Sequence, residues 1–240
     1  MTTSIVCVGA HQDDVELHCL GTLLAWRARG DVEITTVTVT NGDKGGQHDL
    51  SLSHARVAEI RTAEAAAVAE RLGGRYVCLD APDELLEDTP DLRLALTDVL
   101  RAARADVVYA PPPVDYNVDH TVTSQLAHHA CLLAPVRTIA TDHEPLARAP
   151  QLFYTDAITG LEWQPTTYVD ISPHFERKLE LLELHESQMA NMDQFGGWDL
   201  RRYAEVVGAF RGLQCGVAYA EAFAPALAWP RLRPGPLPGA

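Results

Sequence analysis

Residues 4–30 read SIVCVGAHQDDVELHCLGTLLAWRARG, and this stretch decides the fold. Its first part, 4–9, is a continuous apolar run rich in β-branched residues, which is typical of a strand covered on both faces. Residues 16–29 then place leucines at helical spacing, and Gly30 is a stop signal for that helix. A buried strand followed directly by a helix predicts the first unit of a parallel sheet.

The same alternation continues along the chain. Further strands are predicted at 32–40, 76–79 and 106–110, with helices at 53–72, 91–104 and 121–133. The order βαβαβαβ predicts an α/β fold, an open and mostly parallel sheet with helices on both faces. The later pattern is less regular and predicts strands at 152–156 and 167–171, then C-terminal helices at 172–189 and 200–210.

Length and composition limit the class of protein. The 240 residues fit a single domain over 1–228, and the Pro/Gly-rich residues 229–240 read as a loose tail. The net charge of −14 comes from 33 acids against 19 bases, with no dense basic cluster, which argues against nucleic-acid partners. No apolar run reaches the roughly 20 residues that cross a bilayer, so no membrane partner is expected. Five cysteines without a CxxC pair indicate reduced thiols and a cytoplasmic protein.

Polar side chains concentrate in loops that follow predicted strands. His11, Asp13, Asp14 and Glu16 come directly after the first strand, where unpaired carboxylates are costly unless something compensates their charge. His11 and Asp14 are three residues apart, so one turn at a helix start can present both to one ion. Imidazole and carboxylate ligands suit zinc. His120, after the fourth strand, is the natural third ligand because both loops leave the same sheet edge.

Several of these residues also fit roles that need no metal. A His-Asp-Asp cluster alone can be a solvated loop, and the second histidine loop is what favours a metal site. Glu16 either supports the metal loop or is an acid favoured by the helix dipole. The same two roles are open to Asp119, next to His120, and we expect it to support the ligand.

Several motifs together resemble one known family. The segment AHQDDVELHCLGTL (10–23) is similar to the AHPDDxE signature of the LmbE/PIG-L family of zinc-dependent N-acetylglucosaminyl de-N-acetylases. Weaker matches follow in the family's order: TNGDKG at 40–45, RTAE at 61–64, NVDH at 117–120, and Lys178 with HESQ at 185–188. The resemblance runs from residue 5 to about 190 and implies a Rossmann-like α/β sheet.

The resemblance also implies roles for individual residues. By position, His11, Asp14 and His120 bind zinc, and Asp13 is the general base that activates water. Lys44, in the second loop, is a candidate substrate contact, and that loop lacks the Walker A pattern of nucleoside triphosphate sites. Arg61 either holds a substrate hydroxyl or phosphate or forms an ion pair with Glu64.

Two residues depart from the family pattern. Gln12 replaces the proline of the first motif, so other contacts must hold that loop. Asn117 replaces the first histidine of HPDH, and an asparagine can stabilise an oxyanion but cannot deliver a proton at neutral pH. Asp13 must then return the proton itself, or another group such as His185 or His48 must supply it. The pocket can also be arranged around the asparagine, with its amide oriented by neighbours such as Asp115 or Tyr116.

The sequence therefore predicts a zinc-dependent amidohydrolase. Its expected substrate is a small N-acetylated amino sugar or glycoconjugate, which for this family includes intermediates of thiol-cofactor and antibiotic biosynthesis. A thiol-conjugate amidase is a related hypothesis. The alternative from another class is a catalytically altered or non-catalytic binding protein on the same fold, marked by Asn117. Whether the chain forms a homo-oligomer stays open.

Overall fold

The computed structural model describes residues 2–47, 49–160, 163–189 and 199–227, and the predicted tail lies outside them. Its strands are β1 (Thr3–Gly9), β2 (Val32–Thr40), β3 (Arg75–Ala81), β4 (Val107–Ala110), β5 (Gln151–Tyr154), β6 (Thr167–Asp170) and β7 (Ala220–Pro225). Its helices are α1 (Asp14–His18), α2 (Leu20–Arg29), α3 (His54–Leu72), α4 (Pro90–Ala102), α5 (Val118–Leu133), α6 (Phe175–Leu182), α7 (Glu186–Met189) and α8 (Leu200–Cys215).

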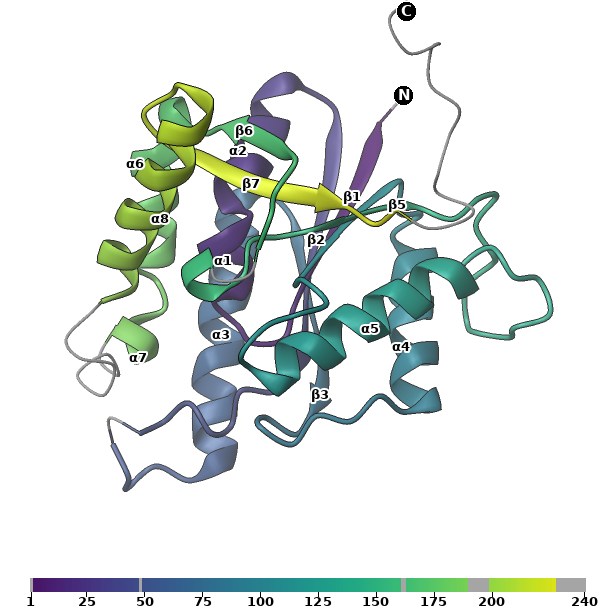
Figure 1. The fold of residues 1–240 in the computed structure, drawn as a ribbon. Helices are drawn as coiled ribbons and strands as arrows, with labels where there is room; N and C mark the ends of the chain where they lie inside the picture. Colours follow the sequence, from purple (N-terminus) through teal and green to yellow (C-terminus); the bar gives the residue numbers. More distant parts are fainter. Residues whose placement is uncertain (1, 48, 161–162, 190–198, 228–240) are drawn as a thin grey trace, which may run out of the picture.

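The strands of this described part form one sheet in the order β3-β2-β1-β4-β5-β7-β6 (Figure 1). Strands β1 to β5 are parallel, as the sequence predicts, and β7 runs antiparallel to both β5 and β6. The sequence pattern did not predict β7. Its segment AEAFAP is rich in alanine, which has a low preference for strands, so the pairing depends on neighbours far away in the chain.

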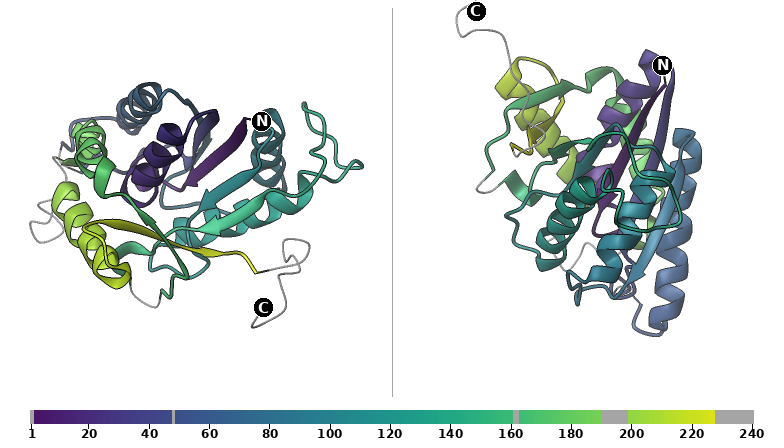
Figure 2. Two further views of the ribbon diagram at one scale, coloured as in Figure 1. Left: turned by 90° about the horizontal axis from the view of Figure 1, so that it is seen from above. Right: turned by 90° about the vertical axis from the view of Figure 1, so that its right-hand side faces the viewer.

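Helices cover both faces of the sheet, as Figure 2 shows. Val6 and Val8 of β1 point to one face and pack in a core with α4 and α5. Ile5 and Cys7 point to the other face, into a core shared with α2, α3 and α6. This alternation explains why β1 is apolar at every position, because both of its faces are buried.

The prediction of a single helix over 16–29 is wrong in one respect. The structure has two helices, α1 and α2, that are separated at Cys19, whose φ is −140°. The predicted helix over 172–189 is also interrupted, into a short 3-10 turn at Ser172–His174, α6 and α7. Apolar spacing does not reveal such breaks, because leucines on both sides keep the same helical phase.

A buried ion pair from distant elements bridges the break between α1 and α2. The carboxylate of Glu221, on β7, accepts hydrogen bonds from the backbone N–H groups of Gly21 and Thr22 at 2.9 and 2.7 Å. Lys178, on α6, donates to the carbonyl of Leu17 at 2.7 Å and to Glu221 at 2.6 Å. Helix-end groups on both sides of the break are therefore satisfied.

Helix α5 begins at Val118 and not at 121, so His120 lies in its first turn. No helix of the described residues is long and apolar enough to cross a membrane. The five cysteines all lie in the described part, and none of them forms a disulfide there.

Candidate active site

The candidate residues meet where the chain changes direction across the sheet. β1 pairs with β2 on one side and with β4 on the other, so the connections from β1 and β4 leave in opposite directions. This switch point opens a crevice beyond the carboxyl ends of the strands, where ligands of open α/β sheets bind. His11 follows β1 at this edge, and His120 follows β4.

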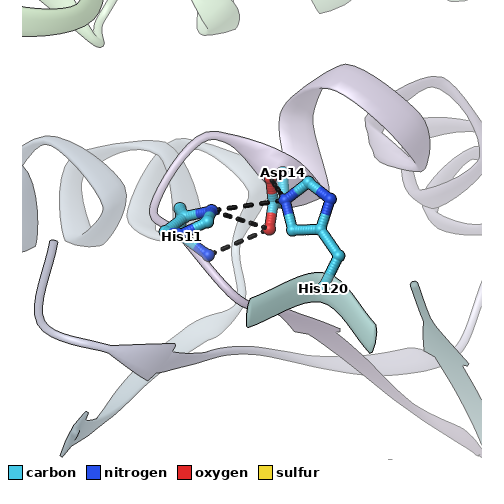
Figure 3. Close-up of side chains that lie close together, drawn as sticks. All are labelled: His11, Asp14 and His120. Carbon is cyan, nitrogen blue, oxygen red and sulfur yellow. Dashed lines mark hydrogen bonds and ion pairs between the residues drawn. The ribbon is translucent and has the colours of Figure 1, made fainter. Parts of the chain in front are cut away.

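Three side chains form a tight cluster in the crevice (Figure 3). Potential ligand atoms of His11, Asp14 and His120 lie within 4.8 Å of one another. Nε2 of His120 is 3.3 Å from Nδ1 of His11 and 3.3 Å from Oδ1 of Asp14. Asp14 Oδ2 accepts hydrogen bonds from the backbone N–H groups of Ala10 and His11 at 2.8 and 2.9 Å, which fixes the carboxylate at the start of α1.

The carboxylates around the cluster favour positive charge within it. Burial lowers the pKa of a histidine, but at His120 the carboxylates of Asp14 and Asp115 outweigh burial and raise the pKa to about 9. At His11 burial is also outweighed, by three carboxylate neighbours, and its pKa lies well above the usual value. Two imidazole nitrogens and a carboxylate oxygen that converge in an electronegative, buried place fit a divalent metal ion.

Each histidine has a carboxylate close to its other ring nitrogen. Asp83 Oδ1 lies 3.1 Å from Nε2 of His11, and Asp115 Oδ1 lies 3.2 Å from Nδ1 of His120. Such partners fix the tautomer and the orientation of metal-binding imidazoles. The sequence pattern predicted neither role. Asp83 lies in the loop after β3, a fourth loop at the same edge, and that position was the signal that could have found it.

Asp119, for which the sequence predicted support of a ligand histidine, lies next to His11. Its Oδ2 lies 3.4 Å from Nε2 of His11 and accepts a hydrogen bond from the N–H of Glu84 at 2.7 Å. Its Oδ1 accepts from the N–H of Leu86 at 3.3 Å. The carboxylate thus joins the first turn of α5 to the loop that carries Asp83.

Arg61 contacts the candidate base. Its guanidinium lies 3.3 Å from Oδ1 of Asp13, and it also donates to the carbonyl of Gly42 at 3.2 Å. The expected alternative, an ion pair with Glu64, is wrong. Glu64 instead accepts hydrogen bonds from the N–H and hydroxyl of Ser187 at 2.8 and 2.7 Å, which attaches α7 to α3.

The second loop is held by side chains of the first. Gln12 is buried, and its Nε2 donates a hydrogen bond to the carbonyl of Thr40 at 3.0 Å. This contact helps to hold the first loop, which lacks the family's proline. Gly42 has a left-handed φ of 69°, and a Cβ there would lie 2.1 Å from Oε1 of Gln12. Lys44 pairs with Asp43, so its ammonium group already has an acidic partner.

Asn117 has a structural task that the sequence pattern did not predict. It is the N-cap of α5, and its Oδ1 accepts a hydrogen bond from the N–H of Asp119 at 2.7 Å. Asp115 accepts from the backbone N–H of Asn117 at 3.0 Å and does not orient its amide. Because Oδ1 of Asn117 is used by this cap, its Nδ2 group is the end of the side chain that can donate hydrogen bonds elsewhere.

Glu16 and His185 lie behind the site. Nε2 of His185 is 3.5 Å from Oε2 of Glu16, and both side chains are buried. Neither belongs to the described lining of the cavity, so His185 is badly placed to protonate a substrate there. Glu16 therefore lies next to His185, whereas the sequence predicted that it supports the metal loop. His48, the other candidate acid, lies outside the described residues.

A cavity of about 860 Å³ opens over the cluster. Seven of the predicted site residues line it, namely His11, Asp13, Asp14, Lys44, Arg61, Asn117 and His120. The acidic residues Asp83 and Glu84 complete its polar side. Gln188 of α7 also lines it, and its Nε2 donates to the carbonyl of Gly45 at 3.2 Å.

Comparison with known protein families gives a match over residues 6–131 to the PIG-L family, described as GlcNAc-PI de-N-acetylase. The chain belongs to the PIG-L family. The matched residues run from β1 to α5 and include the three clustered side chains, the Asp13–Arg61 pair and the loop of Asp83.

Two relatives have the same sequence identity to the chain but carry different activities. The 4-oxalmesaconate hydratase of Pseudomonas putida is 27% identical over 192 residues, covering 77% of this chain and 74% of the hydratase. The diacetylchitobiose deacetylase of Thermococcus kodakarensis is 27% identical over 233 residues, covering 90% of this chain and 80% of the deacetylase.

Two solved structures share the fold of this chain. The N,N'-diacetylchitobiose deacetylase of Pyrococcus horikoshii is 26% identical with a TM-score of 0.81, covering 93% of this chain and 83% of that protein. The 4-carboxy-2-hydroxymuconate hydratase of Pseudomonas putida shares the fold, with a TM-score of 0.83 and 24% identity over 98% of this chain and 99% of that one. Since this fold carries two activities, the reaction must be inferred from the site.

Proposed function

We propose that this protein is a zinc-dependent deacetylase that removes an N-acetyl group from an amino sugar or glycoconjugate. The observation that carries the proposal is the convergence of His11, Asp14 and His120 beside Asp13 in one cavity. The first three residues would hold the ion. When bound there, zinc supplies Lewis-acid polarisation of the amide carbonyl.

Asp13 is the group that we assign to the proton transfers. Its Oδ1 is held by Arg61 at 3.3 Å, so Oδ2 is the atom that takes a proton from the attacking water. The water oxygen bonds to the acyl carbon, the carbon–nitrogen bond breaks, and Asp13 returns the proton to the leaving nitrogen. The products are acetate and a free amine.

Asn117 acts on the developing oxyanion. Because its Oδ1 caps α5, its Nδ2 group is the donor that can face the acyl oxygen. An amide does not release protons at neutral pH, and His185 lies outside the described lining of the cavity. The proton for the amine therefore comes from Asp13.

Hydration of an unsaturated carboxylate is the second candidate, because a hydratase is as similar to the chain as a deacetylase. The charges of the cavity count against it. Four acidic side chains, Asp13, Asp14, Asp83 and Glu84, line the cavity with one lysine, one arginine and the two histidines of the candidate metal centre. Lys44 is paired with Asp43, and Arg61 with Asp13 and Asp83, so each lysine and arginine of the described lining already has a carboxylate partner that an anionic substrate would have to displace.

The test is an acetate-release screen of the zinc-loaded protein on N-acetylated sugars and glycoconjugates. Asp13→Asn should keep one zinc per chain and lose about 10²–10⁴ of the rate, as expected for the removal of a general base. Asp31→Asn removes an exposed carboxylate outside the described lining of the cavity and should change nothing. Acetate release by Asp13→Asn at the wild-type rate contradicts the mechanism. Hydration of an unsaturated dicarboxylate without any acetate release supports the second candidate, and absence of both reactions supports a binding protein.

A further inference from the structure

One wall of the cavity is apolar and comes largely from α8. Leu200, Tyr203, Val206 and Val207 of this helix line the cavity and contrast in character with the acidic loops. Their spacing of three or four residues places them on one helix face. Val206 is 37% exposed, although apolar side chains on a helix beside a core are usually covered.

The wall is fixed to the rest of the fold. Arg211 of α8 makes two hydrogen bonds with the carboxylate of Asp156, at 2.6 and 2.8 Å, and both residues are buried. Leu200, at the start of the wall, and Ala204 also pack into a core with α6. Asp199 caps the helix through the N–H of Arg202. An anchored apolar surface of this kind is a preformed binding surface.

The size and charge of the cavity limit what can lie against this wall. A volume of about 860 Å³ exceeds what one N-acetylated hexose fills, and lies near the top of the roughly 300–1,000 Å³ range of small-molecule sites. The lysine and arginine of the described lining, Lys44 and Arg61, both face carboxylates. A phosphate or carboxylate group on the aglycone therefore has no unpaired lysine or arginine in that lining to meet it.

We propose that the wall formed by Tyr203, Val206 and Val207 binds an uncharged, apolar aglycone of the substrate. This inference rests on the proposed function and names its substrate class: amino-sugar conjugates whose sugar presents the N-acetyl group to Asp13 while an apolar group covers α8. Burial of that group against the valines supplies binding energy that a free sugar lacks.

Alkyl glycosides of N-acetylglucosamine test this inference. Each buried methylene contributes about 0.8 kcal/mol, which is about a fourfold change in affinity, so the butyl glycoside should exceed the methyl glycoside at least ~10-fold in kcat/KM. N-acetylglucosamine 1-phosphate should be a poorer substrate than the methyl glycoside. Val206→Asp should bring the butyl-to-methyl ratio close to one.

The matched control is Leu213→Asp, on the same helix. Leu213 is 79% exposed and outside the described cavity lining, so this variant adds the same charge to α8 and should keep the wild-type ratio. Equal kcat/KM for the methyl and butyl glycosides overturns the inference and leaves the deacetylase proposal intact. A preference for the phosphate overturns it as well.

Binding without turnover gives a second readout. If no glycoside releases acetate, the deacetylase proposal fails, and calorimetric titration of the zinc-loaded protein with the same glycosides decides the inference. Tighter binding of the butyl glycoside, lost in Val206→Asp and kept in Leu213→Asp, supports the apolar wall. Equal binding of both glycosides rejects it.

Discussion

Each histidine of the candidate metal centre has one ring nitrogen toward the cluster and the other toward a carboxylate. For His11 the outer carboxylate is Asp83, at 3.1 Å, and for His120 it is Asp115, at 3.2 Å. A neutral imidazole can donate from only one nitrogen. A carboxylate at the outer nitrogen therefore keeps the hydrogen there and leaves the inner nitrogen as a lone-pair donor toward the ion.

Asp83→Asn and Asp115→Asn should each weaken zinc affinity about 10–100-fold, because loss of the carboxylate frees the ring and its tautomer. Competition with a chromophoric chelator measures the affinity. Asp98→Asn is the control, since Asp98 pairs with the exposed His143 at 3.0 Å. Unchanged affinity in both site variants would show that backbone geometry alone positions the histidines.

Asn117 combines a cap and a proposed oxyanion donor, and two substitutions separate these roles. Asn117→Asp keeps an oxygen that accepts from the N–H of Asp119, so its stability should stay near wild type, whereas Asn117→Ala should lose about 0.5–2 kcal/mol. Both lack the Nδ2 donor and should lose about 10²–10³ in kcat. Urea unfolding of the metal-free proteins and acetate release are the measurements. Wild-type turnover by either variant assigns Asn117 to capping alone.

At the scale of elements, the helical segment after β1 shows a feature that local sequence patterns do not predict. The apolar spacing over 16–29 predicts helical structure, and helical structure is present, but the break at Cys19 depends on Glu221 and Lys178 from the other end of the chain. The strand β7 was missed for the same reason. Local preference describes α3 and its cap at Ser53 well, because the signals for that helix lie within the helix itself.

The sequence predicted the clustered residues of the candidate site but not all of their partners. His11, Asp14 and His120 follow strands whose order the sequence reveals, so their convergence could be expected. The outer carboxylates were not predicted. For Asp83 the available signal was its position after β3 at the same sheet edge, but residue spacing does not show which histidine it lies beside. The true partner of Arg61 also lies in another loop, 48 residues away in sequence.

The Lys178–Glu221 pair should be strongly coupled in stability. Glu221→Ala leaves a buried ammonium group and two amide donors without their acceptor, and removal of one member of a buried pair costs about 3–5 kcal/mol. The double variant Lys178→Met/Glu221→Ala should lose less than the sum of the single variants. Urea unfolding of the four proteins measures the cycle. Arg177→Met, from the exposed Arg177–Glu180 pair, should have little effect. Additive losses would contradict the coupling.

At the scale of the whole molecule, the candidate metal centre joins two parts of the sheet. His11 and Asp14 belong to the β1 side, and His120 belongs to α5 beyond β4, 109 residues from His11. An ion that binds only the folded chain must stabilise it in proportion to its saturation. The stability of the entire fold should therefore report on this site.

Zinc at about 100 times its dissociation constant should raise the free energy of unfolding by about 2.7 kcal/mol, and a chelator should reverse the change. Thermal unfolding with and without zinc measures it. His120→Ala should unfold at the same temperature in both conditions because one of the three proposed ligands is gone. A zinc-dependent shift that persists in this variant would place the ion elsewhere.

The Glu221 carboxylate also has a consequence for synthesis. It satisfies the amides of Gly21 and Thr22 from a position 200 and 199 residues later. A ribosome that adds about 5–20 residues per second needs roughly 10–40 s to cover that interval. During this time the first residues of α2 lack their native acceptor, so the N-terminal end of the chain waits for the C-terminal strand. The native hydrogen bonds at the start of α2 can therefore form only after β7 has been synthesised.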